Sequence, residues 1–431
     1  MKTVAFYTLG CKVNQYETEA VSELFEAAGY IVVPFTDKAD AYIINTCSVT
    51  AMSDRKSRQM IRRAKKTNPE SVIAVMGCYS QTAPDEVLDI DGVNLVLGTR
   101  DRSSVVRLTQ SLTPTDKLNA VTDIKHNHVF EDLSVHRCLD HTRAYIKIQD
   151  GCSQFCSYCI IPYSRGPIRS RPEEDIIREA ETLRDAGFKE LILTGIHAAS
   201  YGIDTGNTSL GRLINRIDQL DGIRRIRLSS IEPMTLDEEF IETIRASKKL
   251  CPHFHISLQS GCDATLKRMN RKYTAAQFAG IAQGLRKAFC DCAITTDIMV
   301  GFAGETDEEF AETLEFIRKL NFAEAHVFQY SPRRGTPAAK FKDQVSPEVK
   351  EARSKAVIGL TNRSRDGFLN RHLGKTMEVL FETRVSDGMF EGKTANYINV
   401  HAPSEKDISG EFLMVRLEKA GDGIMYGEIV N

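Results

Sequence analysis

Residues 152–159 read Cys-Ser-Gln-Phe-Cys-Ser-Tyr-Cys and closely follow an apolar run, 144–149, that is typical of a buried β-strand. Three thiolates at this C-x3-C-x2-C spacing can face one iron–sulfur cluster and bind three of its four irons. The fourth iron then remains open, as a catalytic metal site requires. Zinc is the alternative, but it normally takes a fourth Cys or His at motif spacing, and the next dozen residues contain neither. The loop therefore predicts a 4Fe-4S cluster on Cys152, Cys156 and Cys159.

The loop lies in a series of alternating apolar and amphipathic segments, which is typical of consecutive β/α units. The sequence predicts strands at residues 144–149, 190–194, 225–229, 254–258, 294–300 and 325–330, with helices at 173–186, 236–247, 275–287 and 307–319. Six strands with five crossovers favour a partial (β/α)6 barrel over a second flat sheet, although periodicity alone does not separate the two.

The segments on either side of this series have different patterns. In the first hundred residues, strands predicted at 3–8, 31–34, 41–45, 71–76 and 94–97 alternate with helices at 17–28 and 55–66. This alternation indicates an open, mostly parallel α/β sheet. After a predicted helix at 347–370, short strands with glycines between them indicate a small β-barrel. The sequence thus predicts an α/β protein with domains at residues 1–135, 140–372 and 373–431.

Three further cysteines, Cys11, Cys47 and Cys78, each end a predicted strand of the N-terminal sheet. Side chains at the carboxyl ends of neighbouring parallel strands meet in one crevice, so these thiolates could hold a second cluster with one iron free. Ordinary buried cysteines are the alternative, because cysteine is common in cores. The repeated setting favours ligation. The other cysteines share no setting, and we interpret them as packing residues: Cys138, Cys251, Cys262, Cys290 and Cys292.

Composition and charge exclude several classes of protein. Of the 431 residues, 42% are hydrophobic and 26% are charged, which is ordinary for soluble globular chains. No apolar run approaches the length of a membrane span, and the N-terminus shows no signal peptide. Eleven cysteines without a secretory signal indicate metal or catalytic thiols in the reducing cytoplasm rather than disulfides. A net charge of -2 argues against wholesale nucleic-acid coating but permits a local basic patch.

The cysteine loop resembles that of the radical S-adenosylmethionine (SAM) superfamily, with Tyr158 just before its last cysteine. Nearly the whole chain resembles the methylthiotransferases of that superfamily, including residues 8–14, 161–166, 169–171 and 258–261, and its tail resembles an RNA-binding TRAM domain. The resemblance implies two 4Fe-4S clusters: one cleaves SAM to a 5′-deoxyadenosyl radical, and the N-terminal one handles the sulfur to be inserted. A second SAM would donate the methyl group. An electron donor such as flavodoxin or ferredoxin and a source of sulfur are partners to be expected.

Strand ends of the barrel supply candidates for SAM contacts, because they line its catalytic face. These candidates are Thr194, Gly195, Glu232, Gln259 and Gly301. The resemblance implies that the turn at 194–195 meets the amino group of SAM and that the segment from Gly301 lies near its adenine. Ala303 departs from the family pattern, since relatives often carry Pro there. Structural turns explain the glycines almost as well.

Residues 55–66 carry seven basic residues in twelve. At helical spacing Arg55, Arg58, Arg62 and Lys66 share one face, which could follow the phosphates of an RNA. A solvated charged helix is the usual alternative. Because this helix begins soon after Cys47, we expect it to lie near the N-terminal cysteines and to contact RNA.

Methylthiotransferases of three branches act on different targets. These are N6-isopentenyladenosine at position 37 of tRNA, N6-threonylcarbamoyladenosine at the same position, and an aspartate of a ribosomal protein. Residues 194–197, Thr-Gly-Ile-His, with Tyr201 and Gly202 resemble the threonylcarbamoyladenosine branch; the isopentenyl branch tends to carry Asn where His197 stands. A strand-end histidine could instead have only a packing role. We expect a transferase that adds a methylthio group to C2 of N6-threonylcarbamoyladenosine-37 (ms2t6A formation).

A non-catalytic iron–sulfur protein that binds RNA or transfers electrons belongs to a different class and is the alternative. A ferredoxin needs four ligands for each cluster, and both cysteine sets here offer three. Reductive cleavage of SAM to 5′-deoxyadenosine distinguishes the two classes.

Overall fold

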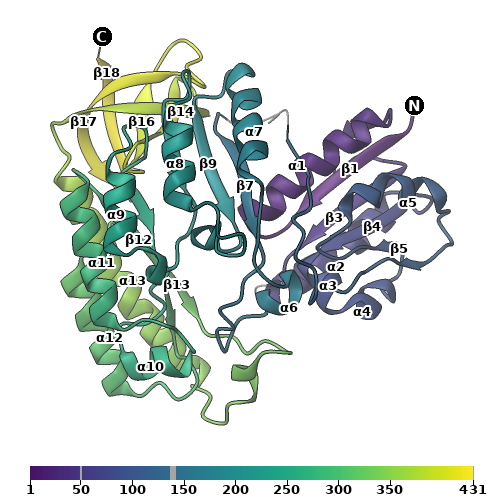
Figure 1. Cartoon of the computed structure of the whole chain (residues 1–431), viewed down its shortest axis with the longest axis horizontal. Helices are drawn as coiled ribbons and strands as arrows, with labels where there is room; N and C mark the ends of the chain where they lie inside the picture. Colours follow the sequence, from purple (N-terminus) through teal and green to yellow (C-terminus); the bar gives the residue numbers. More distant parts are fainter. Residues whose placement is uncertain (49–50, 136–141, 431) are drawn as a thin grey trace.

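The computed structural model describes residues 1–48, 51–135 and 142–430 (Figure 1). Three regions follow one another along the chain: a parallel sheet with helices on both faces, a curved set of β/α units, and a small closed β-barrel. In Figure 1 the N-terminal sheet lies beside the β/α units, and the closed barrel packs at one end of them. None of the described helices is long and apolar enough to cross a membrane. The predicted domain boundary at 135–140 falls mostly outside the described residues, as does Cys138.

The N-terminal sheet is parallel, as the sequence predicts, in the order β2-β1-β3-β4-β5-β6. Its strands are β1 (Thr3–Thr8), β2 (Ile31–Val33), β3 (Ala41–Thr46), β4 (Val72–Gly77), β5 (Val93–Val96) and β6 (Leu118–Asn119). Every residue of β3 and β4 is buried, because helices cover both faces of the sheet. One face packs against α1 (Lys12–Ala27) and α5 (Val105–Ser111), and the other against α2 (Ala51–Thr67), α3 (Cys78–Thr82) and α4 (Pro84–Leu88).

The register of this sheet brings three strand ends to one edge. Thr8 of β1 pairs with Asn45 of β3, and Thr46 of β3 pairs with Gly77 of β4. Cys47 directly follows Thr46, and Cys78 directly follows Gly77. The third cysteine, Cys11, follows the end of β1 after Leu9 and Gly10. All three cysteines therefore leave adjacent strands at the same level.

The central region contains the six predicted strands in sequential order. They are β7 (Ala144–Asp150), β9 (Glu190–Gly195), β10 (Arg225–Leu228), β11 (His253–His255), β12 (Ala293–Val300) and β13 (Glu324–Gln329), with the short antiparallel β8 (Arg169–Ser170) at the edge. β7, β9 and β10 form one parallel sheet, and β11, β12 and β13 form another. Isolated parallel bridges, Ile226 to Leu250 and Ile231 to Ile256, join β10 to β11. The result is a partial barrel that is not closed between β8 and β13.

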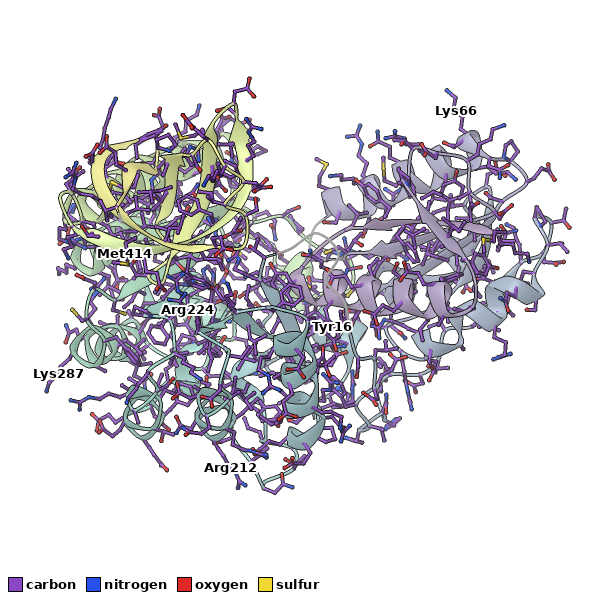
Figure 2. The ribbon with its side chains drawn as sticks, turned by 90° about the horizontal axis from the view of Figure 1, so that it is seen from above. Tyr16, Lys66, Arg212, Arg224, Lys287 and Met414 are labelled. Carbon is purple, nitrogen blue, oxygen red and sulfur yellow. The ribbon has the colours of Figure 1, made fainter. Side chains whose placement is uncertain are left out.

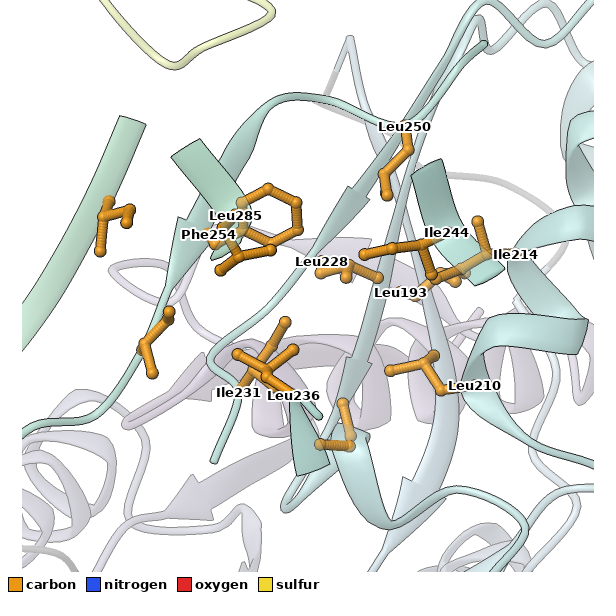
Figure 3. Packing of buried hydrophobic residues seen from close by; sticks show 14 of the residues in the cluster. Leu193, Leu210, Ile214, Leu228, Ile231, Leu236, Ile244, Leu250, Phe254 and Leu285 are labelled. Carbon is orange, nitrogen blue, oxygen red and sulfur yellow. The ribbon is translucent and has the colours of Figure 1, made fainter. Parts of the chain in front are cut away.

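Helices cover the outside of the partial barrel: α7 (Glu173–Asp185), α8 (Leu210–Asp218), α9 (Glu238–Arg245), α10 (Asp263–Arg268), α11 (Ala275–Ala288) and α12 (Asp307–Leu320). Aliphatic side chains from helix and strand interdigitate between the two layers, as Figure 3 shows for Ile214 of α8, Leu228 of β10 and Leu285 of α11. This core, which contains Phe254 and Ile244 as well, fixes the strand ends that carry the candidate site residues.

The long helix α13 (Pro347–Asn370) leads to the C-terminal barrel, which closes in the order β14-β15-β16-β18-β17. Its strands are β14 (Thr376–Ser386), β15 (Met389–Thr394), β16 (Asn399–Pro403), β17 (Phe412–Gly421) and β18 (Ile424–Val430). Two arginines of β10 attach this barrel to the central region. Arg225 donates to the backbone carbonyl of Lys393 (3.0 Å), and Arg227 donates to that of Ala395 (3.1 Å).

The helices differ from the expectation in two ways, in where they begin and in number. Helix α1 begins at Lys12 rather than at Glu17, because its first turns bury the polar side chains of Asn14 and Glu17, which interrupt the apolar periodicity. Several short helices were not predicted, among them α3, α4, α5, α10 and α8, the last of which follows a polar, glycine-containing loop. Its start is stabilised by Ser209, whose hydroxyl accepts the backbone N–H of Arg212 (3.3 Å).

Candidate functional site

The three N-terminal cysteines lie together at the carboxyl edge of the sheet. A Cβ atom on Gly10, next to Cys11, would lie 3.0 Å from the Sγ of Cys47. Asn14 ties the two strand ends together, since its side-chain amide donates to the carbonyls of Leu9 (2.7 Å) and Thr46 (3.0 Å). Cys47 and Cys78 are buried, and Cys11 lies at the exposed rim before α1.

The radical-type loop after β7 brings Cys152, Cys156 and Cys159 near enough for the charges of their thiolates to affect one another. Its backbone is fixed at both ends: the N–H of Cys152 donates to Gly166 (3.0 Å), and that of Ser157 donates to Met269 (2.9 Å). Burial, and then the neighbouring Cys156, raise the pKa of Cys152 to about 11 and that of Cys159 to about 12. These thiols are therefore protonated at neutral pH until a metal displaces the proton.

The donor chemistry of both sets, three thiols each, is the kind that an iron–sulfur cluster requires. Among the described residues, no three His, Cys, Asp or Glu side chains lie close enough to share one metal ion. A zinc ion would require all its ligands within about 2.3 Å of one centre. In a 4Fe-4S cubane each thiolate binds its own iron, so the ligands are spread over a larger group. Each set supplies three such thiols, and the ten described cysteines form no disulfide.

A buried ion pair lies beside the radical-type loop. Arg271 contacts Glu232 (2.8 Å) and donates to the carbonyl of Ser257 (2.9 Å), and its Nη1 lies 3.5 Å from the Sγ of Cys156. Burial raises the pKa of Glu232, although Arg271 opposes that rise. Glu232 was predicted from its strand end. Arg271 was not predicted from the sequence.

The turn after β9 packs tightly on β7. A Cβ on Gly195 would come within 2.9 Å of the Oε1 of Gln149, which accepts the backbone N–H of His197 (2.8 Å). Thr194 is buried and pairs with Lys147 of β7. The close approach that Gly195 permits is thus to another part of the chain, and its contact with SAM stays a prediction.

His197 is a buried imidazole whose hydrogen-bonding capacity is unused within the described residues: neither ring nitrogen has a partner there. Only 7% of the residue is exposed. Burial, and then the charge of Arg271, lower its pKa to about 4, so the ring is neutral at pH 7. A neutral imidazole offers one donor and one acceptor to a ligand.

A cavity of about 590 Å³ opens beside Cys159 and has the size of a small-molecule site. Gln259 lines it together with Asp297 and Tyr330. Gln259 has a left-handed φ of 65°. Its backbone N–H donates to the carbonyl of Asp297, and its carbonyl accepts the N–H of Met299 (2.8 Å each), so the side chain is the part of Gln259 that is available to the cavity. This cavity is the candidate SAM pocket.

Gly301 has a packing role in the structure. Its φ is 67°, its N–H donates to Glu305 (2.7 Å), and a Cβ there would lie 2.3 Å from Lys350. The contact predicted between this segment and adenine remains a prediction.

The basic helix predicted at 55–66 is α2. Arg55, Arg62 and Lys66 are exposed, and Figure 2 shows Lys66 projecting from the outer side of the N-terminal region. Arg58 is half-buried and donates to the hydroxyl of Tyr79 (2.9 Å), so this arginine is already engaged within the protein. Three of the four predicted RNA contacts are therefore available on the surface.

One buried arginine that the sequence analysis did not single out links the two cysteine sets. Arg165 lies in α6 (Ile161–Arg165), just after the radical-type loop, and its Nε donates to the Sγ of Cys78 at 3.3 Å. It belongs to a segment, 161–166, that was quoted only as part of the family resemblance.

Comparisons with known proteins agree with this arrangement. Residues 146–317 match the radical SAM superfamily, and residues 3–98 match a family described as the uncharacterized protein family UPF0004. These matches cover the partial barrel with its cysteine loop and the N-terminal sheet with its three cysteines.

Several relatives carry the name threonylcarbamoyladenosine tRNA methylthiotransferase MtaB. The one from Bacillus subtilis is 44% identical, over 100% of this chain and 97% of its own. The one from Thermotoga maritima is 38% identical, over 98% of this chain and 96% of its own. A tRNA-2-methylthio-N(6)-dimethylallyladenosine synthase from Acetivibrio thermocellus is 35% identical over 100% of this chain and 91% of its own.

Solved structures share the fold at low sequence identity. The radical SAM methyltransferase TsrM of Kitasatospora setae has a TM-score of 0.60 at 14% identity, with 78% of this chain and 75% of that chain covered. Another structure of TsrM holds cobalamin and a 4Fe-4S cluster. Radical SAM enzymes use SAM and such a cluster, and methylthiotransferases carry two. On the strength of its full-length relatives, this chain belongs to the tRNA methylthiotransferases of the radical SAM superfamily.

Proposed function

We propose that this enzyme adds a methylthio group to C2 of N6-threonylcarbamoyladenosine at position 37 of tRNA. The observation that carries the proposal is the pair of three-cysteine sets, which lie close enough for Arg165 of one segment to reach the sulfur of Cys78 in the other. Methylthio transfer needs both a radical at an unactivated carbon and a source of sulfur, and two sets with one open iron each supply two such sites.

We assign Cys152, Cys156 and Cys159 to the cluster that binds SAM, and Cys11, Cys47 and Cys78 to the second cluster. When bound, the first cluster supplies the electron that cleaves SAM, and the second supplies the metal site for sulfur. The protein positions these groups and excludes water. Glu232 and Arg271 fix one side of the loop, and the cavity beside Cys159 receives the cofactor.

His197 supports the threonylcarbamoyl substrate over the isopentenyl one. Its two ring nitrogens lack a partner in the described chain, and leaving buried polar atoms unpaired costs about 1–3 kcal/mol each. A threonylcarbamoyl group can pair with them through its carboxylate, hydroxyl or amide, whereas an isopentenyl group offers no polar atom. We therefore assign His197 to recognition of the polar substituent.

Mass spectrometry of tRNA nucleosides tests the substrate. A strain that lacks this gene should lose 2-methylthio-N6-threonylcarbamoyladenosine and keep 2-methylthio-N6-isopentenyladenosine. Loss of the isopentenyl product alone would assign the enzyme to that branch, and an unchanged tRNA profile would favour a protein substrate or a non-catalytic iron–sulfur protein. The purified, reduced enzyme should also form 5′-deoxyadenosine from SAM.

The remaining partners follow from the chemistry. Reductive cleavage of SAM needs a low-potential electron donor, for which we propose a flavodoxin or a ferredoxin. Sulfur must come from an external source, because the thiomethyl group leaves with the product. We place the reaction in the cytoplasm, where tRNA is found and thiols stay reduced.

A further inference from the structure

Arg165 is a fully buried arginine that contacts groups from both halves of the site. It lies shortly after Cys159 on the short helix α6, so its backbone belongs to the radical-type loop. Its side chain leaves that loop and reaches Cys78, 87 positions away in sequence, with an Nε to Sγ distance of 3.3 Å. The arginine thus joins one cysteine set through its backbone and the other through its side chain.

Three polar groups hold the guanidinium in this orientation. Nη2 donates to the side-chain carbonyl of Asn14 (2.6 Å), and Nη1 donates to Glu17 (2.5 Å) and lies 3.4 Å from Asp150. The two Nη groups therefore bind oxygen acceptors, and Nε is the nitrogen that donates to the sulfur. Arg165 therefore acts on Cys78 in two ways, through its positive charge and through the directional N–H···S contact, and a lysine at this position would keep only the charge.

We propose that Arg165 is a positioning residue for the N-terminal cysteine set. It donates a hydrogen bond to the sulfur of Cys78 and thereby raises the reduction potential of the cluster held there. Hydrogen bonds to ligand sulfurs favour the reduced, more negative state of a cluster, because they stabilise the added charge. The inference rests on the proposed function, since it takes Cys78 as a ligand.

The other cysteine set carries a comparable contact. Arg271 donates to the sulfur of Cys156 at 3.5 Å and is likewise held by a buried carboxylate, Glu232. Each set therefore has one anchored arginine at one sulfur. The difference is that Arg165 comes from the opposite half of the site. Displacement of the radical-type loop would therefore change the hydrogen bond to the N-terminal cysteine set.

The test uses the full chain with Cys152, Cys156 and Cys159 replaced by Ala, so that only the N-terminal set can bind a cluster. In this background Arg165→Lys keeps a positive charge beside Glu17 but loses the Nε donor. Arg102→Lys is the matched control, because Arg102 is equally buried and contacts Glu17 (2.9 Å) and yet makes no hydrogen bond to a cysteine sulfur within the described residues. Iron content and an electron-paramagnetic-resonance redox titration are measured for each protein.

The background and both variants should hold about four irons per chain. The potential should become more negative in Arg165→Lys and stay at the background value in Arg102→Lys. An unchanged reduction potential in Arg165→Lys would overturn the proposal. An equal shift in both variants would overturn it as well, because it would assign the effect to the charge around Glu17. If the background binds no iron, the ligand assignment of the proposed function is wrong, and the inference falls with it.

A measurement without substitution at Arg165 covers the case in which the Lys variant does not fold. Resonance Raman spectra of the one-cluster background in H2O and D2O report N–H···S bonds through the isotope shift of the iron–cysteine stretching bands. We expect a shift on exchange. Bands that do not move would show that no exchangeable donor, Arg165 included, reaches a ligand sulfur.

Discussion

At the scale of single residues, Cys47 shows how a buried thiol is assigned a chemical role. Its burial alone would suit a packing residue. Its position at a strand end, against Gly10 and beside Cys11, is what distinguishes it from the buried Cys251 and Cys262, which lie in no such group.

Replacing Cys47 with Ala should separate the two halves of the reaction. The variant should still cleave SAM reductively, because the radical-type loop is intact, but it should attach no thiomethyl group. Cys251→Ala is the control and should do both. The readouts are 5′-deoxyadenosine and the modified nucleoside, measured in the same reaction. Normal methylthiolation by Cys47→Ala would show that Cys47 has only a packing role.

His197 can be tested in the same way. His197→Asn introduces the residue that the isopentenyl branch tends to carry. We expect kcat/KM for threonylcarbamoyladenosine tRNA to fall by about 5- to 150-fold, the equivalent of one lost buried polar contact. SAM cleavage without tRNA should not change. If SAM cleavage falls in parallel with transfer, His197 serves the cofactor rather than the substrate.

The positions of the six candidate ligands could be predicted because their signals are simple: a spacing of three cysteines within one loop, and three strand ends of one sheet, as the structure has them. Their ligation of clusters stays a prediction. The sequence contains no comparable signal for Arg165 and Arg271, whose sulfur partners are 87 and 115 positions away. An arginine in a turn is ordinary in a sequence. Only the fold shows that these two are buried and aimed at sulfur.

At the scale of elements, helix α2 carries the clearest prediction about RNA. Arg55, Arg62 and Lys66 are exposed, whereas Arg58 binds Tyr79. Changing the three exposed residues to Gln should lower the slope of log tRNA affinity against log salt by roughly two to three units, since each phosphate contact contributes about 0.7–0.9. Arg58→Gln should leave the slope unchanged.

The C-terminal barrel is the rival for RNA contact. If the triple Gln variant keeps the wild-type salt slope while removal of residues 376–431 abolishes tRNA binding, α2 is a solvated face only. Filter binding or fluorescence anisotropy at several salt concentrations distinguishes these outcomes.

Element types were predictable wherever apolar periodicity was strong, as in the parallel strands, and the bounds of α13 agree with the expectation although its apolar pattern is weak. The start of α1 was not, since Asn14 and Glu17 are buried for reasons outside the helix itself. Some of their partners, Lys147 and Arg165, come from the central region, so no local pattern reports them.

At the scale of the whole molecule, Glu17 joins the N-terminal sheet to the partial barrel. It contacts Arg102 (2.9 Å) of its own region and Lys147 (2.7 Å) and Arg165 (2.5 Å) of the other. Burial alone would raise the pKa of Glu17, but these cations lower it to about 2 from an ordinary value of 4.5. The carboxylate therefore stabilises the fold above pH 4.5, and this contribution disappears as the pH falls toward 2.

We expect Glu17→Gln to lose stability on the order of 3 kcal/mol at neutral pH and to show a flatter decline between pH 5 and 2. Denaturant unfolding of the metal-free chain measures this, because acid also decomposes iron–sulfur clusters. Glu26→Gln, an exposed change on the same helix, is the control and should follow the wild type. Identical pH profiles for Glu17→Gln and the wild type would contradict a role for this carboxylate between the two regions.

The joint between β10 and the C-terminal barrel has an evolutionary consequence. Arg225 and Arg227 donate to main-chain oxygens of Lys393 and Ala395, and Arg225 also pairs with the carboxylate of Glu378 (3.2 Å). Every amino acid supplies a main-chain oxygen, so this part of the joint tolerates substitutions at 393 and 395, whereas the Glu378 contact depends on its carboxylate. Lineages are thus free to diversify the outward-facing loops of this module, and a module transplanted from a distant relative would still seat on the same two arginines.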